Sequence, residues 1–151
     1  MAESIISGKI IKGIGGFYYI DALDGIQYEC KAKGIFRNKK IKPLVGDNVN
    51  IEILDPENNL GNIVEILPRF NSLIRPAVAN IDQTIIIFAV SEPEPNFNLL
   101  DRFLVSMEKS RVDTIICFNK LDLSADNMDA CKSYEKSGYR TLFISARDGE
   151  G

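Results

Sequence analysis

Two short motifs in the second half of the chain combine residue types that can recognise a purine base. Asn119, Lys120 and Asp122 fit the pattern N-K-x-D, and Ser145 and Ala146 follow further along. The Asp122 carboxylate offers two acceptors that match the N1–H and N2–H₂ donors of guanine, whereas adenine presents an acceptor at N1 and no amine at C2. A site built to hydrogen-bond a group strongly rejects a ligand that lacks it. The pattern therefore favours guanine over adenine.

The remaining motif residues can complete such a site. The Lys120 stem can lie over the purine plane while its ammonium stays hydrated. The Asn119 amide can tie loops together and reach the N7/O6 side, and the Ala146 N–H can point at O6. The alternative is an ordinary turn at a helix entry, because Asn and Asp are common in such loops. Ser145 and Ala146 alone carry no signal.

Both motifs stand where a predicted strand ends. The apolar runs Thr84–Val90, Thr114–Phe118 and Thr141–Ile144 predict three strands, and Leu99–Ser110 and Ser124–Lys136 predict the intervening helices. This alternation predicts an α/β unit with parallel strands covered on both faces. Ligands of such sheets bind at the carboxyl ends of the strands. The two motifs are therefore expected at one edge of the sheet.

The first half of the chain has a different rhythm. Short β-type runs broken by turn residues occupy 8–13, 17–22, 27–33, 47–54 and 61–67. Gly13–Gly16 lacks the spacing of a phosphate-binding loop, so it is interpreted as a turn between strands. Five short strands without a helical stretch predict an oligonucleotide/oligosaccharide-binding (OB) type β-barrel over residues 1–68.

Basic residues are concentrated in one part of this half. Between Glu29 and Asp47 there are six lysines and arginines and no acid. OB-type barrels often bind nucleic acid through basic and aromatic side chains, but a solvated, lysine-rich hairpin explains the cluster equally well. The candidate RNA-binding residues are Lys31, Lys33, Arg37, Lys39 and Lys40. The aromatic residues that could stack on a base or fill the core are Phe17, Tyr18, Tyr19, Tyr28 and Phe36.

Composition excludes several kinds of chemistry. The 151 residues contain no histidine and carry a formal net charge of −3, so histidine-based catalysis and histidine-ligated metals are excluded within them. Cys30, Cys117 and Cys131 form no C-x-x-C pair and are expected to be structural. No apolar run is long enough to span a membrane and the N-terminus lacks a signal-peptide pattern, which predicts a cytoplasmic protein.

The order of the motifs points to a family. No G-x-x-x-x-G-K-[ST] loop precedes Asn119; instead there is a barrel with Gly34–Arg37 and Val45–Val49, followed by the stretch Leu73–Gln83 (LIRPAVANIDQ). In these features the chain resembles the RsgA family of circularly permuted GTPases, in which the base motifs precede the phosphate loop. The predicted fold is multidomain, β plus α/β: a five-stranded OB-type barrel and part of a Ras-like, circularly permuted P-loop GTPase domain.

The resemblance implies a GTPase that acts late in maturation of the small ribosomal subunit, which stimulates GTP hydrolysis. It implies that the barrel contacts ribosomal RNA and that Asn119, Lys120, Asp122, Ser145 and Ala146 bind the guanine of GTP or GDP. The expected organisation is a barrel over 1–68, a connector over 69–82, and the first part of the GTPase domain over 83–151. The complete protein is expected to be monomeric, with no membrane partner.

Phosphoryl transfer needs a phosphate cradle, a metal and a positioned water. The resemblance places the catalytic residues, and those for Mg²⁺ and a structural Zn²⁺, downstream of Gly151. The chain is therefore expected to be a fragment without GTPase activity of its own. Two alternatives stay open: a non-enzymatic RNA-binding OB module with an α/β docking domain, and a different nucleotide enzyme in which N-K-L-D is fortuitous.

Overall fold

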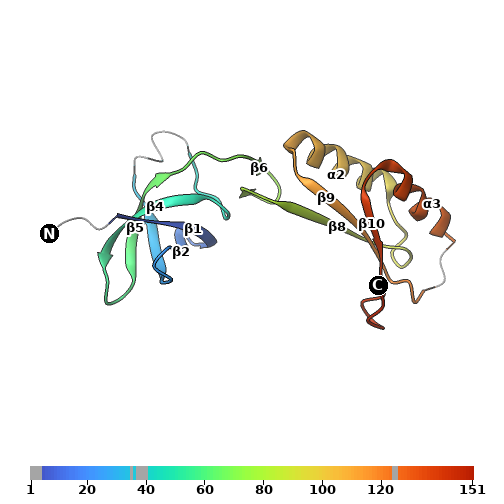
Figure 1. The fold of residues 1–151 in the computed structure, drawn as a ribbon, viewed down its shortest axis with the longest axis horizontal. Coiled ribbons are helices and arrows are strands. Elements are labelled where there is room, and N and C mark those ends of the chain that lie inside the picture. Colours follow the sequence, from blue (N-terminus) through green and yellow to red (C-terminus); the bar gives the residue numbers. More distant parts are fainter. Residues whose placement is uncertain (1–4, 35, 37–40, 124–125) are drawn as a thin grey trace. The chain divides into compact units, whose positions relative to one another are not determined.

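The chain forms two compact units. The computed structural model describes residues 5–34, 36, 41–123 and 126–151. Contacts divide the chain into Met1–Ile81 and Asp82–Gly151. The first unit is made of strands, and the second combines a small sheet with helices (Figure 1). Each unit is described separately.

The first unit is a closed five-stranded barrel. Its strands are β1 (Ile5–Ile14), β2 (Phe17–Ala22), β3 (Gln27–Ala32), β4 (Asn48–Asp55) and β5 (Leu60–Ile66). The order around the barrel is β1-β2-β3-β5-β4, and pairing of β1 with β4 closes it. Only β3 and β5 run parallel. The prediction of a five-stranded, OB-type barrel is confirmed.

Alternation along the strands supplies the barrel core. Ile10, Ile20, Val49, Ile51 and Ile63 have no exposed surface, and they come from four of the five strands. Successive side chains of a strand point to opposite faces, so apolar residues at every second position meet inside the barrel. Burial of each such side chain contributes about 1.5–3 kcal/mol.

The β1–β2 connection is a two-glycine turn. Gly15 and Gly16 have φ values of 60° and 87°, the positive values that a tight two-residue hairpin turn requires at both positions. Glycine adopts them without steric cost. The sequence interpretation of Gly13–Gly16 as a turn is confirmed for Gly15 and Gly16, whereas Gly13 and Ile14 belong to β1.

The segment expected as a connector carries a small hairpin of its own, β6 (Ser72–Leu73) with β7 (Val78–Ala79). Gly46, with φ of 92°, lies so close to this hairpin that an added Cβ would stand 1.9 Å from the Ala79 carbonyl oxygen. Only glycine allows that approach. The hairpin therefore packs against the barrel.

Two asparagine side chains secure the same segment. The buried Asn80 donates through Nδ2 to the Gly46 carbonyl (2.9 Å) and accepts from the Phe70 N–H (3.0 Å). Asn71 accepts from the Ile81 N–H (2.7 Å) and donates to the Ile81 carbonyl (2.8 Å). The chain is therefore held to the first unit as far as Ile81.

A buried ion pair joins the segment to the barrel. Asp47 has no exposed surface, and its carboxylate accepts from Arg69 Nε (2.6 Å), Arg69 Nη2 (2.8 Å) and the Leu44 N–H (2.7 Å). Arg69 Nη2 also donates to the Lys42 carbonyl (2.8 Å). Hydrogen bonding to Asp47 raises the pKa of the Arg69 guanidinium, so the guanidinium stays charged.

We expect Arg69→Met to lower the free energy of unfolding by about 3 kcal/mol, because it leaves a buried carboxylate without its cation. Urea unfolding followed by circular dichroism measures the change. Arg75→Met, at an exposed arginine of the same segment, is the matched control. Equal losses in the two variants would contradict the role given to the ion pair.

The second unit is a three-stranded parallel sheet with helices. Its strands are β8 (Gln83–Ala89), β9 (Asp113–Asn119) and β10 (Arg140–Phe143), in the order β10-β9-β8. Helix α2 (Phe97–Ser110) connects β8 to β9, and α3 (Met128–Ser133) with a 3₁₀ turn (Tyr134–Ser137) connects β9 to β10. The α/β prediction is confirmed.

The helix bounds differ from the sequence prediction. Helix α2 begins two residues before Leu99, because the Asn96 side chain caps it by accepting from the Leu99 N–H (3.0 Å). The predicted cap Ser124 lies outside the described residues, and α3 begins at Met128. Gly138 ends the 3₁₀ turn with φ of 88°, the left-handed conformation expected of a C-terminal glycine.

Strand β8 has an uncovered face. Ile85 and Ile87 are 54% and 63% exposed, whereas Ile86 between them is buried. Helix α2 packs on β8 and β9, and strand alternation turns Ile85 and Ile87 away from the side on which Ile86 is covered. The prediction that the strands are covered on both faces is therefore wrong for β8.

The 151-residue chain should self-associate through β8. Among the described residues this strand pairs only with β9, and a free strand edge beside exposed apolar side chains favours pairing with another chain. We expect Ile87→Lys to shift the chain toward monomer in size-exclusion chromatography with light scattering. Ile74→Lys, at the 91% exposed Ile74 outside this sheet, should change nothing. A wild-type chain that stays monomeric at all concentrations would contradict this expectation.

Candidate functional site

The two predicted base-recognition motifs lie at one edge of the sheet. Strands β9 and β10 are parallel neighbours, with Phe118 opposite Phe143. Beyond the strands, the Ile144 N–H donates to the Phe118 carbonyl (2.9 Å) and the Leu121 N–H donates to the Ile144 carbonyl (3.1 Å). The loop that begins at Asn119 is therefore bonded to the segment that leads into Ser145.

The Asn119 side chain joins the two loops. Its Oδ1 accepts from the Lys120 N–H (2.7 Å) and from the Ala146 N–H (3.0 Å). The Asn119 main-chain carbonyl accepts from the Val90 N–H (2.9 Å) at the end of β8. One residue thus connects the ends of three strands, and the expected role of Asn119 in tying loops together agrees with this geometry.

The Ala146 N–H points differently from the sequence expectation. It was expected to face guanine O6, and in the structure it donates to Asn119 Oδ1. To donate to a base as well, this N–H has to share its hydrogen between the two acceptors. The sequence could not indicate this, because Asn119 and Ala146 are 27 positions apart.

Asp122 is positioned by the second motif. Ser145 Oγ donates to Asp122 Oδ1 (2.9 Å) and accepts from the Asp148 N–H (3.2 Å). Although Asp122 lies on an exposed loop, its side chain is only 12% exposed. The buried serine therefore holds the carboxylate in one orientation, which base recognition by two acceptors requires.

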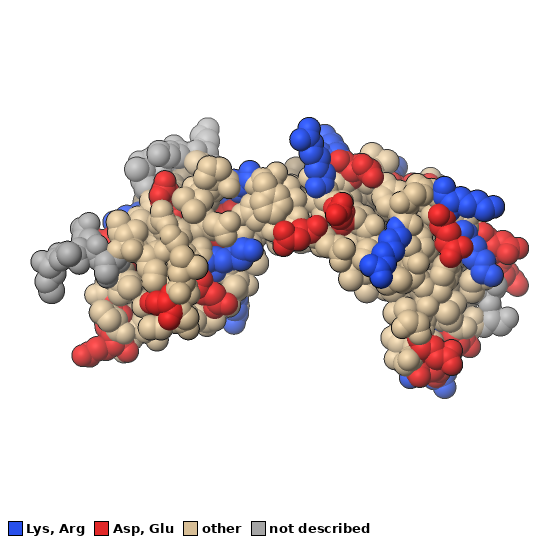
Figure 2. Space-filling model, viewed as in Figure 1, with Lys and Arg blue, Asp and Glu red and all other residues tan. Residues whose placement is uncertain are grey.

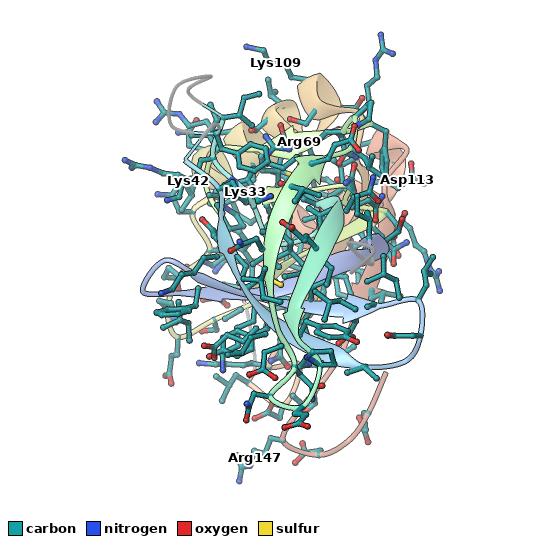
Figure 3. All side chains as sticks on the ribbon, turned by 90° about the vertical axis from the view of Figure 1, so that its left-hand side faces the viewer. Lys33, Lys42, Arg69, Lys109, Asp113 and Arg147 are labelled. Atoms are coloured by element: carbon teal, nitrogen blue, oxygen red, sulfur yellow. The ribbon has the colours of Figure 1, made fainter. Side chains whose placement is uncertain are left out.

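Arg147 is a contact that the sequence analysis missed. Its Nη1 lies 3.5 Å from Asp122 Oδ2, and the side chain is 78% exposed. Figure 3 shows Arg147 extending outward from its loop. An exposed ion pair of this kind contributes little to stability, so the arginine can release the carboxylate at low cost. Its position directly after Ser145–Ala146 is the only signal in the sequence.

Lys120 is held by a second loop. It has a positive φ of 68°, and its Nζ donates to the main-chain carbonyl of Glu92, which also has a positive φ of 47°. The sequence predicts a hydrated Lys120 ammonium, whereas in the structure the ammonium contacts Glu92, which no sequence pattern indicates. The loop after β8 therefore determines where the Lys120 stem runs.

Residues 145–150 form a closed turn. The Ser145 N–H donates to the Glu150 carbonyl (2.8 Å), and the Ser145 carbonyl accepts from the N–H groups of Gly149 (2.8 Å) and Glu150 (3.1 Å). The segment directly after Ser145 and Ala146 is therefore a turn that closes back on Ser145.

The lysine cluster of the barrel is partly engaged. Lys33 Nζ pairs with Glu52 (2.5 Å), and Lys31 Nζ lies 4.8 Å from the centroid of the Phe17 ring. Both lysines line the same cavity as Lys42, and Figure 3 shows Lys33 and Lys42 on one side of the barrel. The candidates Arg37, Lys39 and Lys40 lie outside the described residues.

The surface is not uniformly basic. On the face shown in Figure 2, acidic and basic side chains are interspersed over both units. The five aromatic candidates are also unequal, because Tyr28 and Phe36 belong to the buried core whereas Phe17 is 36% exposed. Phe17 is therefore more accessible to a base than Tyr28 or Phe36.

Comparison with protein families matches both units. The model of the RsgA N-terminal domain matches residues 7–63, and the model of the RsgA GTPase matches residues 66–151. The chain belongs to the RsgA GTPase family. The resemblance inferred from motif order and barrel is confirmed.

Individual RsgA relatives show the same correspondence. The chain is 55% identical over 158 residues to the small ribosomal subunit biogenesis GTPase RsgA of Agathobacter rectalis, covering 97% of this chain and 52% of that protein. It is 48% identical over 146 residues to the RsgA of Alkaliphilus metalliredigens, covering 95% of this chain and 50% of that protein. The chain thus spans about half the length of these relatives.

Two solved structures are similar. The crystal structure of YloQ, described as a circularly permuted GTPase, matches with a TM-score of 0.77 and 36% identity, over 95% of this chain and 53% of that one. YjeQ from Thermotoga maritima matches with a TM-score of 0.82 and 30% identity, over 98% of this chain and 54% of that one. Nearly the whole of this RsgA family chain therefore has the same fold as the corresponding half of these two structures.

The described residues offer no metal site. Within them, no group of three His, Cys, Asp or Glu side chains could hold an ion. No helix in the described part is long and apolar enough to cross a membrane.

The cysteines of this RsgA family chain should be unreactive when it is folded. All three are free and buried. Burial raises the pKa of Cys30 to about 12 and also raises the pKa of Cys117 and Cys131, so little reactive thiolate forms at pH 8. We expect a chromogenic disulfide reagent to label no thiol in the native chain and all three in guanidinium chloride. Labelling of a native cysteine at the unfolded rate would contradict a structural role.

Proposed function

We propose that the complete protein is a GTP hydrolase that acts in biogenesis of the small ribosomal subunit in the cytoplasm. The relatives are named small ribosomal subunit biogenesis GTPase RsgA, which supports this proposal. Within the complete protein, the role of the present chain is to select the nucleotide base and to contact ribosomal RNA. The phosphate contacts and the metal ions belong to the part of the relatives that this chain does not span.

One observation carries the guanine assignment: residues of the two motifs bond to each other. Asn119 accepts from the Ala146 N–H, and Ser145 donates to Asp122. An ordinary helix-entry turn does not require hydrogen bonds to a second loop that is distant in sequence. A base-recognition site does, because its donors and acceptors must be held before the ligand arrives.

In the proposed complex, both Asp122 oxygens accept from guanine N1–H and N2–H₂, and Arg147 moves away from the carboxylate. The Lys120 stem lies along one face of the purine, and Asn119 holds the loop that carries Ala146 near O6. We also propose that the barrel contacts RNA through Lys31, Lys33, Arg37, Lys39 and Lys40. The proposed organisation of the chain is a barrel (1–68), a connector (69–82) and a GTPase part (83–151).

Asp122→Asn tests the guanine site in the complete protein. An asparagine cannot accept both guanine donors, so we expect GTP to bind about 100-fold more weakly. The Asn amide can instead donate to the 2-oxo group of xanthine, so xanthosine triphosphate should bind better than GTP. Titration with fluorescent analogues of both nucleotides measures the two affinities.

Asp113→Asn is the matched control, because this exposed aspartate lies at the opposite end of the same strand, β9. Its affinity for GTP should equal that of the wild type. If Asp122→Asn also leaves GTP affinity unchanged, the guanine assignment is wrong and the alternative of an RNA-binding module without nucleotide recognition gains support.

A further inference from the structure

The barrel contains a cavity that the guanine site does not account for. It measures about 630 Å³, a volume within the range of small-molecule sites. It opens between the β1–β2 turn, strand β3 and the segment at residues 41–43. A smaller neighbouring cavity of about 230 Å³ shares six of its lining residues. The groups that give it its chemistry are Gly16, Phe17, Tyr18, Lys31, Lys33 and Lys42.

The charge of the cavity has one sign. Three lysines line it, and none of the described lining residues is acidic. This contrasts with the chain as a whole, which has more acidic than basic residues. A cavity of this kind attracts an anion, although the surrounding surface carries both signs.

The aromatic side chains that line the cavity indicate which kind of anion fits it. Phe36 is part of the buried core and Tyr18 packs against that core, so Phe17 is the lining ring with a substantially open side, at 36% exposure. The Lys31 ammonium lies 4.8 Å from the Phe17 centroid, in the geometry of a cation–π contact, so a base that stacks on this face of the ring displaces it. An open ring beside lysines suits a ligand with a flat face and a negative charge.

The lysines are not equivalent. Lys33 is paired with Glu52, and the Lys31 ammonium rests on a ring. No ion pair is formed by Lys42 within the described residues, and its main chain is fixed by the hydrogen bond from Arg69 to its carbonyl. Lys42 is therefore the cation best placed to take a phosphate, and Lys31 can follow by leaving the ring.

We propose that this cavity binds one unstacked nucleotide, with its base on the Phe17 ring and its phosphate on Lys42 and Lys31. This nucleotide can belong to a single-stranded RNA or be free in solution. The RNA source rests on the proposed function, whereas the site itself does not. Base–aromatic stacking with basic groups along the backbone is how proteins hold single strands.

The test uses the full chain and a single-stranded hexanucleotide RNA that carries 2-aminopurine, whose fluorescence is quenched when it stacks. Phe17→Leu keeps an apolar side chain but removes the ring, and we expect about tenfold weaker binding and loss of the quenching. Phe17→Tyr keeps a ring and should restore both. Phe70→Leu is the matched control, because Phe70 is exposed in the same unit and does not line the cavity.

Lys31→Gln and Lys42→Gln should weaken binding and reduce its salt dependence, since each removes a phosphate contact. Lys12→Gln is their control: the Lys12 ammonium lies 5.1 Å from the Tyr19 centroid, and neither residue lines the cavity. Thermal unfolding of each variant checks that it folds. Hexanucleotide binding that is unchanged in folded Phe17→Leu, or equal competition by the same RNA as a duplex, would overturn the proposal.

Competition by uridine monophosphate identifies the source. If uridine monophosphate competes at the same concentration as the unlabelled hexanucleotide, the ligand is a free nucleotide. If only the unlabelled hexanucleotide competes, the ligand is part of an RNA strand. Both outcomes support the cavity as a nucleotide site. The Asp122→Asn titration is independent of this result. Failure of guanine recognition with intact hexanucleotide binding would refute the proposed function and leave the cavity, and the reverse would refute the cavity alone.

Discussion

The first unit depends on a carboxylate that has no access to water. Asp47 is buried, and three donors satisfy it: two from Arg69 and one from the Leu44 N–H. Because an unpaired buried charge is so costly, the loop before β4 and the segment after β5 must stay together. The same arginine fixes the Lys42 carbonyl, which places Lys42 at the rim of the cavity. The attachment of the segment after β5 and the position of Lys42 at the proposed nucleotide site thus depend on one ion pair.

The second unit uses a neutral side chain in a comparable way. Parallel pairing brings the ends of β8, β9 and β10 to one edge, but strand pairing stops before the loops begin. Asn119 continues the connection by bonding to Val90 through its carbonyl and to Ala146 through Oδ1. Ser145 completes it by orienting Asp122. The groups of the proposed guanine site are therefore already held in place by the fold, which lowers the ordering cost of the proposed binding.

The two units divide the work of recognition. The proposed guanine site reads the edge of a base through directed hydrogen bonds, so it distinguishes one base from another. The proposed cavity in the barrel holds the face of a base and a phosphate, so it distinguishes an unstacked nucleotide from a paired one. An RsgA family protein that carries both can respond to the identity of its nucleotide and to the exposure of an RNA base at the same time.

The sequence by itself determined the five barrel strands, the α/β order and the motif positions, because period-two alternation and apolar runs such as Thr84–Val90 follow directly from which faces are buried. It also indicated the family, because Asn119, Lys120 and Asp122 follow a barrel and the stretch Leu73–Gln83 with no phosphate loop before them. The tertiary structure alone decided the partners of these residues: Glu92 for Lys120, Asn119 for the Ala146 N–H, Arg147 for Asp122 and Phe17 for Lys31. Such contacts join segments far apart in the chain or depend on loop conformation and side-chain direction, and neither leaves a periodic trace in sequence. The tertiary structure also decided the exposure of Ile85 and Ile87, because an apolar strand has the same sequence pattern whether one or both of its faces are covered.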